Sequence, residues 1–366
     1  MLTMHPTLLV GPADWDPVRM PKEEFRARID AMWRQDPAAG GAIVHGDSRD
    51  HADLAYLTNF TPKLAPALAL IPRAGEPQLL VGGGANMVPA AKPLTWIDRL
   101  LPLRDAGNTV AAWARALPGG NRLLLIGGDG MRHAMHRDII GALAPDVVLT
   151  PTDARLALQA PCMSAREIAA IRDSCATLDA ATVALTEARR SGVGTTAALL
   201  AAEHAAWRAG AQDVRTLFSI NGGGRLQPFA LPVERTADPF QVYIAVRRLG
   251  YWAEGFVMLA DRPHPPLECV RAVRRQALAG VGPGVSRGDL SDAVTKGVKP
   301  HKCHPVSAGM ESAVHIGLSL DDAGRDDLLA PGDVLSLRVG VAGDEGAAIV
   351  SAMIAITDSG NEVLWS

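Results

Sequence analysis

The chain of 366 residues is 48% hydrophobic and 20% charged, and its formal net charge is −3. This composition is typical of a globular protein that is long enough for two ordinary domains. The small net charge favours neither nucleic acid nor an anionic membrane surface as a partner, and no apolar run approaches the roughly 20 residues that span a bilayer.

The N-terminus and the cysteines indicate the compartment. Residues 1–17 lack a basic start followed by an apolar segment, so we expect no secretion signal. The four cysteines are scattered without a C-x-x-C pair, which argues against a zinc ribbon or a disulfide scaffold. We therefore expect a protein of the reducing cytoplasm.

Residues 1–150 alternate between helical and strand patterns. In residues 22–36, the apolar Phe25, Ile29 and Met32 recur at helical spacing and predict an amphipathic helix. Short apolar runs predict buried strands at 41–46, 68–72, 78–84 and 122–130, the last of which runs into a glycine-rich turn. That turn has neither the Lys-Ser/Thr of a phosphate loop nor a G-x-G-x-x-G pattern, so we interpret it as a plain turn. The alternation predicts an α/β domain.

Residues 151–163 are rich in turn formers and are expected to link this domain to a second one. Ser164 and Glu167 have the spacing of a capping box and predict the start of a long helix over 164–188. Two further helices are predicted at 195–211 and 267–281. Apolar runs predict five strands in this half, at 216–221, 240–248, 250–259, 334–341 and 347–357.

Several segments carry a resemblance to a known family. DLAYLTNF (53–60) is similar to an N-x-x-Y-L-T-G-F motif, and APCMSAREIAAIRDSC (160–175) is similar to a K-S-x-x-E-I-x-x-I-R motif. LLAPGDVLSLRVGV (328–341) and AAIVSAMIAITDSGNEVL (347–364) are similar to the blocks L-x-P-G-M-x-F-S-x-E-P-G and R-I-E-D-x-x-x-V-T-x-x-G-x-E-x-L. In this order, they resemble the pita-bread family of creatinase, aminopeptidase P, prolidase and methionine aminopeptidase. The resemblance implies an α/β (α+β) chain with a small creatinase-like N-terminal domain over 1–155 and a pita-bread domain over 156–366.

Catalytic members of that family hold two metal ions with two Asp, one His and two Glu side chains, which are donors that suit divalent metals. The resemblance places these ligands at Ala245 or Val246, and at Glu254, Val314, Arg338 and Val350. Of these residues, only Glu254 can be a ligand, because an arginine is permanently cationic and has no free lone pair. We therefore expect neither a metal nor another cofactor.

We expect Arg338 to replace the metal as the positive charge and to form a bidentate pair with Glu254, since a buried carboxylate without a partner is costly. Glu254 and Arg338 are thus candidate catalytic residues, and a purely structural ion pair is the alternative. His315, one residue after Val314, is the third catalytic candidate because imidazole titrates near neutral pH. A structural histidine is the alternative for His315.

Four residues are candidates for substrate binding: Trp252, Arg225, Phe229 and His304. Trp252 and Phe229 can form walls of a ligand pocket, with core packing as the alternative. Arg225, in a glycine-rich loop, can hold a carboxylate, with a solvated arginine as the alternative. His304 belongs to an H-x-C-H cluster that lacks the second half of a zinc site.

Three functions follow from the resemblance. The creatinase and ectoine-hydrolase branch of the family works without metals and splits a non-peptide C–N bond. The first hypothesis is therefore a metal-independent enzyme, a C–N hydrolase or lyase, that acts on a small polar molecule by acid–base chemistry. Arg338 stands where creatinase has its second catalytic Glu, and residues 222–232 lack the creatinase histidine, so we do not expect creatine hydrolysis.

The second hypothesis is a non-catalytic protein that binds a ligand or a protein partner, and the third is an Xaa-Pro-type metallopeptidase. The resemblance also implies a homodimer.

Overall fold

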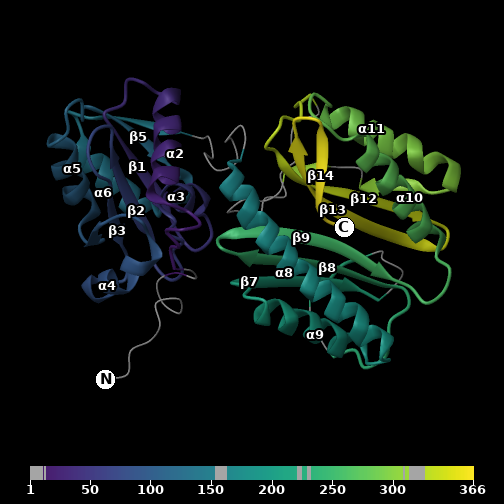
Figure 1. Cartoon of the computed structure of the whole chain (residues 1–366). Helices are drawn as coiled ribbons and strands as arrows, with labels where there is room; N and C mark the ends of the chain where they lie inside the picture. The colour runs from purple at the N-terminus through teal and green to yellow at the C-terminus, as the bar shows by residue number, and fades with distance from the viewer. Residues whose placement is uncertain are drawn as a thin grey trace. The chain divides into compact units, whose positions relative to one another are not determined.

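The computed structural model describes Gly11 and residues 14–152, 163–220, 225–228, 232–307, 310–312 and 326–366. Within these residues, the chain forms two compact units, one up to residue 152 and the other from residue 163 onwards (Figure 1). Both units combine helices with sheets, so the predicted mixed α/β class is confirmed. None of the helices in these ranges is long and apolar enough to cross a membrane.

The first unit is built on a six-stranded sheet in the order β4-β3-β2-β1-β5-β6. Strand β2 pairs antiparallel with β1 and with β3, whereas the other neighbours are parallel. The strands are β1 (Gly41–Gly46), β2 (Ala67–Pro72), β3 (Gln78–Val81), β4 (Arg99–Pro102), β5 (Arg122–Ile126) and β6 (Val148–Thr152). The helices are α2 (Lys22–Gln35), α3 (Ala52–Thr58), α4 (Val88–Ala91), α5 (Ala106–Arg115) and α6 (His133–Leu143).

The apolar runs of this unit form its core, in which Ile43, Leu68 and Leu123 are buried against α5 and α6. The residues after β5 form a short 3-10 turn (Gly128–Gly130), as expected for a plain turn. Gly127 has a φ of +71°, and a Cβ there would lie 2.7 Å from the carbonyl oxygen of His45. The turn therefore requires glycine for both its backbone conformation and its close approach to β1.

The second unit contains two antiparallel sheets. One is three-stranded, in the order β7-β8-β9, and the other has the order β10-β12-β13-β14, with β11 also paired to β12. The strands are β7 (Asp213–Ser219), β8 (Phe240–Arg248), β9 (Tyr251–Leu259), β10 (His304–Ser307), β11 (Met310–Ser312), β12 (Val334–Gly343), β13 (Gly346–Thr357) and β14 (Gly360–Trp365). The helices are α8 (Ala165–Arg190), α9 (Thr195–Arg208), α10 (Pro265–Gly280) and α11 (Arg287–Val298).

Helix α8 begins at the predicted capping box. Ser164 Oγ accepts a hydrogen bond from the backbone N–H of Glu167 (3.2 Å), and Glu167 Oε2 accepts one from the backbone N–H of Ser164 (3.0 Å). The other carboxylate oxygen of Glu167 accepts a hydrogen bond from the hydroxyl of Tyr251 at 3.2 Å. The cap thus ties the start of α8 to the start of β9, the strand that carries Glu254.

The two faces of β12 and β13 have different roles because side chains alternate along a strand. Leu337 and Val339 of β12 belong to an apolar core that includes residues of α10 and α11. Arg338 lies on the opposite face of the sheet. Beside it, Ser351 Oγ of β13 accepts a hydrogen bond from the backbone N–H of Phe256 in β9 at 2.8 Å. This contact joins the two sheets and brings β9 against the face of β12 that carries Arg338.

Gly255 of β9 offers a test of this packing. A Cβ at residue 255 would lie 2.6 Å from the Cζ3 atom of Trp365, at the end of β14, so the indole would have to move. We expect Gly255→Ala to lower the free energy of unfolding by about 1–3 kcal/mol, as overpacked cores do. Urea denaturation is the measurement.

Gly280→Ala is the matched control, because a Cβ at this exposed residue of α10 meets nothing within 4 Å. The control should leave stability unchanged or raise it slightly. Equal stability of the two variants would contradict the packing of β9 against β14.

Candidate functional site

The register of β7, β8 and β9 places polar side chains in rows across one face of their sheet. Residues directly opposite each other on paired strands share a face. Successive rows are Asp213, Arg247 and Trp252; Arg215, Ala245 and Glu254; and Leu217, Tyr243 and Phe256. We call this the polar face. It is turned towards β12, since Arg338 of that strand contacts Glu254.

Glu254 lies at the centre of the polar face and has 0% exposure. Its Oε1 atom accepts hydrogen bonds from Arg338 Nε at 3.0 Å and from Arg338 Nη2 at 2.5 Å. Its Oε2 atom accepts a hydrogen bond from the Tyr243 hydroxyl at 2.8 Å. The pairing with Arg338 is thus present, but both arginine nitrogens contact one oxygen, because Tyr243 occupies the other.

Aromatic rings enclose this ion pair. The guanidinium of Arg338 lies 5.2 Å from the centre of the Phe256 ring, and that ring lies 4.8 Å from the ring of Tyr243. A cation near an aromatic face is attracted by the ring quadrupole. Arg338, with 7% exposure, is therefore held by the Glu254 carboxylate and by an aromatic surface.

Burial, together with the charge and the hydrogen bond of Glu254, raises the pKa of Tyr243 above its usual range. The phenol therefore stays protonated at neutral pH and acts as a hydrogen-bond donor. It donates a hydrogen bond to the carboxylate of Glu254 and adds no negative charge beside it.

The structure also resolves which residues stand at the positions that the resemblance assigns to metal ligands. Ala245 is the register partner of Glu254, so Ala245 and not Val246 lies on the polar face. On β13, Ser351 is opposite Arg338, whereas Val350 belongs to the core with α10 and α11. Our assignment of Val350 was therefore wrong by one residue, because a one-residue step along a strand reverses the face.

These side chains do not fit a pair of metal ions. Ala245, Arg338 and Ser351 offer one hydroxyl and no carboxylate, and the hydroxyl already accepts the N–H of Phe256. The carboxylate of Glu254 is neutralised by Arg338. Elsewhere in the described ranges, no group of three or more His, Cys, Asp or Glu side chains is arranged to hold a metal ion. Val314 and His315 lie outside those ranges.

The other predicted site residues have different surroundings. Trp252 is on the polar face with 2% exposure, and the guanidinium of Arg215 lies 4.5 Å from its ring centre. Arg225 is exposed within residues 225–228, and His304 is exposed at the start of β10, opposite Ala342. Phe229 lies outside the described residues.

Sequence reasoning missed Tyr243 and Ser351. Tyr243 is two residues from Ala245 on the same strand, so the period of a strand places the two on one face. That signal was in the sequence. Ser351 depended on the strand register, which the sequence does not contain.

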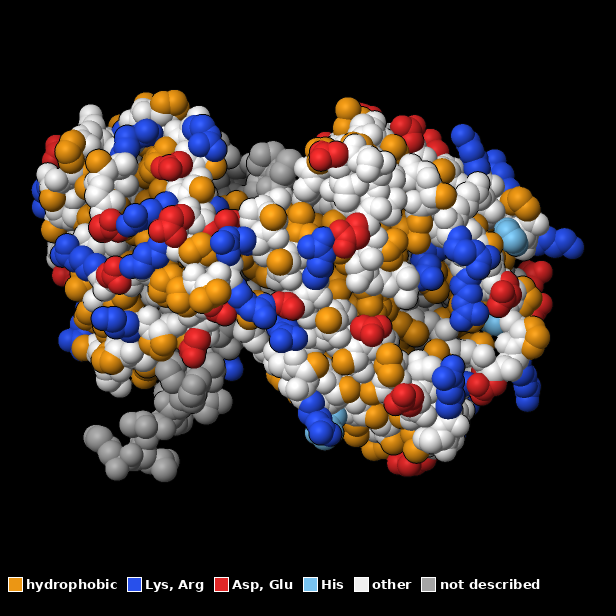
Figure 2. All heavy atoms as spheres, in the orientation of Figure 1, with side chains coloured by type: hydrophobic (Ala, Val, Ile, Leu, Met, Phe, Trp, Pro, Cys, Tyr) orange, Lys and Arg blue, Asp and Glu red, His pale blue; other side chains and the backbone are white. Residues whose placement is uncertain are grey.

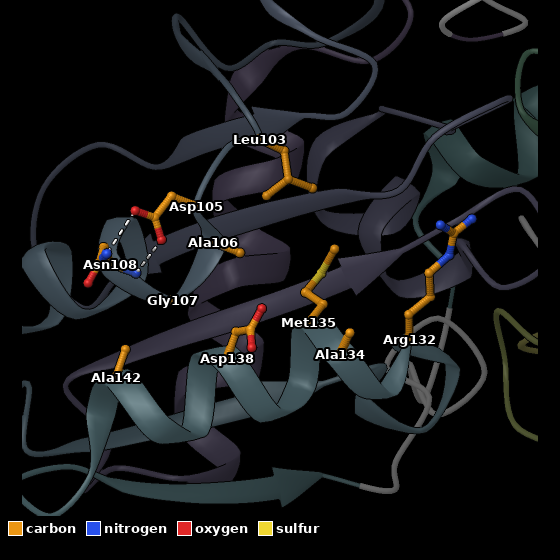
Figure 3. A pocket seen from close by; sticks show the side chains of 10 residues that line it. All are labelled: Leu103, Asp105, Ala106, Gly107, Asn108, Arg132, Ala134, Met135, Asp138 and Ala142. Atoms are coloured by element: carbon orange, nitrogen blue, oxygen red, sulfur yellow. Dashed lines mark hydrogen bonds between the residues drawn. The ribbon is translucent and has the colours of Figure 1, made fainter.

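A pocket of about 490 Å³ lies in the first unit between α5 and α6 (Figure 3). Asp105 and Asn108 line one side of it, and Asp138 lies on the other. The Asp105 carboxylate caps α5, since it accepts hydrogen bonds from the backbone N–H (3.4 Å) and the Nδ2 atom (2.7 Å) of Asn108. On the face of this unit shown in Figure 2, basic and acidic side chains are interspersed. The Asp105 carboxylate of this pocket is thus engaged in capping a helix, which is a structural role. We therefore place the candidate site on the polar face of the second unit.

Removal of the guanidinium tests the dependence of Glu254 on Arg338. We expect Arg338→Met to lower the free energy of unfolding by about 3–5 kcal/mol, because it leaves a buried carboxylate without a counter-charge. The double variant Glu254→Gln/Arg338→Met should be more stable than Arg338→Met alone, since it removes the uncompensated charge. Urea denaturation of the wild type, Glu254→Gln, Arg338→Met and the double variant measures the coupling.

The exposed pair of Arg172 and Glu362, with side-chain exposures of 49% and 43%, provides the control. Arg172→Met should cost about 0–1 kcal/mol. A cost of Arg338→Met no larger than that of Arg172→Met would show that Glu254 does not require its partner.

The raised pKa of Tyr243 predicts how stability depends on alkaline pH. The folded protein keeps the phenol proton at a pH where the unfolded chain releases it, near the usual value of about 10. The stabilisation is therefore complete below about pH 10 and is lost as the pH rises further. We expect the urea midpoint of the wild type to fall more steeply above about pH 10 than that of Tyr243→Phe. Parallel decreases in the two proteins would contradict this assignment.

No protein-family model matches the sequence, and no curated protein matches it. Solved structures do match. The prolidase from Pyrococcus horikoshii OT3 is 15% identical with a TM-score of 0.71, over 94% of this chain and 98% of that chain. Aminopeptidase P from Escherichia coli in its low-pH form is 17% identical with a TM-score of 0.70, over 94% of each chain. A dipeptidase from Mycobacterium ulcerans is 13% identical with a TM-score of 0.71, over 97% of each chain. At these identities the likeness concerns the fold, and the chain therefore has the α/β pita-bread fold of these proteins.

Proposed function

We propose that the second unit acts on a small polar molecule without a pair of metal ions. The observation that carries this proposal is the contact of Glu254 with Arg338 and Tyr243. Arg338 and Tyr243 together occupy both carboxylate oxygens of Glu254. Among the described residues at which the resemblance expects metal ligands, Glu254 is the one carboxylate. The resemblance to the metal-independent creatinase branch supports the same conclusion.

Electrostatics favours this proposal over a metallopeptidase. A divalent cation beside Glu254 would lie within a few ångströms of the fixed positive charge of Arg338, and like charges at that distance repel strongly in a buried site. Ala245, opposite Glu254, and Ser351, opposite Arg338, offer no carboxylate that would offset this repulsion. Solved structures of the same fold carry the names of Xaa-Pro peptidases, so an Xaa-Pro-type metallopeptidase is the alternative that this argument weighs against.

As an enzyme, the chain is proposed to be a C–N hydrolase or lyase that works by acid–base chemistry. Glu254 is the proposed general acid or base, or the anchor of a cationic group. Arg338 is the proposed partner of an anionic group or a developing oxyanion. Tyr243 donates a hydrogen bond to Glu254. His315 is proposed to carry protons.

This mechanism requires a rearrangement on binding. Both oxygens of Glu254 are engaged, so a substrate can reach the carboxylate only after Arg338 or Tyr243 has moved away. An anionic substrate can cause this, because it competes with Glu254 for the guanidinium of Arg338. Binding would then release the carboxylate next to the bound molecule.

A second candidate function is non-catalytic binding of a ligand or a protein partner. The burial of Glu254 and Trp252, with exposures of 0% and 2%, favours it, because a catalytic group must reach the reacting atoms. The homodimer and the domain boundaries of 1–155 and 156–366 also stand as proposals from the resemblance, and the cytoplasmic location stands as a proposal from the scattered cysteines.

Metal analysis tests the first part of the proposal. We expect the full chain, expressed in medium supplemented with Mn, Co and Zn, to contain far less than one ion per chain by mass spectrometry. The reason is that its donor set cannot neutralise divalent ions. An aminopeptidase P purified in parallel is the positive control. Stoichiometric metal together with chelator-sensitive cleavage of Xaa-Pro dipeptides would overturn the proposal.

Turnover then separates the two candidate functions. A panel of amide, ureido and guanidino compounds is incubated with the wild type and with Glu254→Gln, and C–N cleavage is followed by mass spectrometry. Cleavage by the wild type that is lost in a folded Glu254→Gln supports the enzyme. Saturable binding of a panel compound without turnover supports the binding protein.

A further inference from the structure

Two cysteines of the second unit meet on the apolar side of the sheet that contains β12, the side opposite to Arg338. Cys269 of α10 has 0% exposure and belongs to the core that includes Leu337 and Val339. Cys303, the residue before β10, is partly exposed and packs against the same core. Both cysteines are free thiols. The pair therefore joins a buried residue to one that is partly open to solvent.

The two thiols are in direct contact through a hydrogen bond between their side chains. Burial, followed by the charge of Cys303 and this hydrogen bond, raises the pKa of the Cys269 thiol to about 11, so Cys269 keeps its proton at neutral pH. A Cβ on Gly343 would lie 3.3 Å from Cys303 Sγ, so this sulfur also packs against the end of β12. The fold thus fixes Cys303 close to both α10 and β12. Among the described side chains, no third His, Cys, Asp or Glu is arranged with the two sulfurs to hold a metal ion.

We infer that Cys269 and Cys303 form a reversible disulfide under oxidising conditions, and that this bond fastens α10 to the start of β10. A disulfide requires sulfur atoms about 2 Å apart, so the two have to approach more closely than in a hydrogen bond. Cys303 makes this movement, because it stands between a 3-10 turn (Lys299–His301) and β10 and belongs to neither. The bond closes a loop that contains α11, and loop closure stabilises a fold chiefly by restricting the unfolded chain.

The oxidant is a low-molecular-weight disulfide, such as glutathione disulfide. The thiolate of Cys303 attacks one sulfur of this compound, whose S–S bond breaks, so that a mixed disulfide forms and one thiolate leaves and takes up a proton. Cys269 then gives its proton to solvent and attacks the Cys303 sulfur, which releases the second small thiol. Two protein thiols are thus oxidised, and one small disulfide is reduced to two thiols. Cys303 reacts first because it is the more exposed of the two.

The test is incubation of the full chain with an excess of glutathione disulfide, followed by alkylation of the remaining thiols in urea and mass spectrometry. We expect two fewer alkylated thiols per chain than in the untreated protein, and a proteolytic peptide pair linked through Cys269 and Cys303. Dithiothreitol should restore both thiols. Thermal unfolding followed by circular dichroism should shift upwards by about 5–10 °C on oxidation, because the closed loop restricts the unfolded chain.

Cys303→Ser removes the partly exposed thiol and should remain folded, with no loss of further thiols and no thermal shift on oxidation. Cys175→Ala is the matched control, because Cys175 is a buried cysteine of α8 outside this pair, and it should form the disulfide as the wild type does. The inference is overturned if the wild type keeps both thiols, if its disulfide joins other cysteines or two chains, or if oxidation does not raise the unfolding temperature. None of these measurements depends on turnover or on metal content, so the disulfide and the proposed function stand or fall separately.

Discussion

The ion pair of Glu254 and Arg338 is the interaction on which the second unit depends. A carboxylate with no exposure has lost its hydration, and only a counter-charge and hydrogen bonds can replace it. The two partners come from different sheets, β9 and β12, so the pair also fixes how these sheets meet. The hydrogen bonds from Phe256 to Ser351 and from Ile349 to Gln241 hold the same junction from the backbone side. The register of both sheets therefore has to be correct before the carboxylate can be buried.

This pair changes what the polar face can hold. In the metal-binding proteins that the sequence resembles, carboxylates surround cations. In this chain a guanidinium stands among the strands, and two more arginines flank Trp252. Tyr243 contributes to this arrangement, because its protonated phenol satisfies the second oxygen of Glu254 without adding negative charge.

Much of the fold was predictable because the local signals are strong. The apolar runs that became β1, β2, β8, β9, β12 and β13 are bounded by turn residues, and the capping box at Ser164 starts α8 as its spacing indicates. Helices α5 and α6 were not predicted, because both are short and each contains a glycine, which disfavours a helix. In the site, the pairing of Glu254 with Arg338 was predicted, whereas its one-oxygen geometry and the contribution of Tyr243 were not.

The sequence by itself determined the fold class and the positions of the long strands β8, β9, β12 and β13. Only the tertiary structure decided that Ala245 and Ser351, and not Val246 and Val350, share a face with Glu254. It also decided that Arg215 and Arg247 meet at Trp252. The physical reason is the two-residue period of a strand. A shift of one residue reverses the face of every side chain, and register is set by pairing between strands that lie far apart in the sequence.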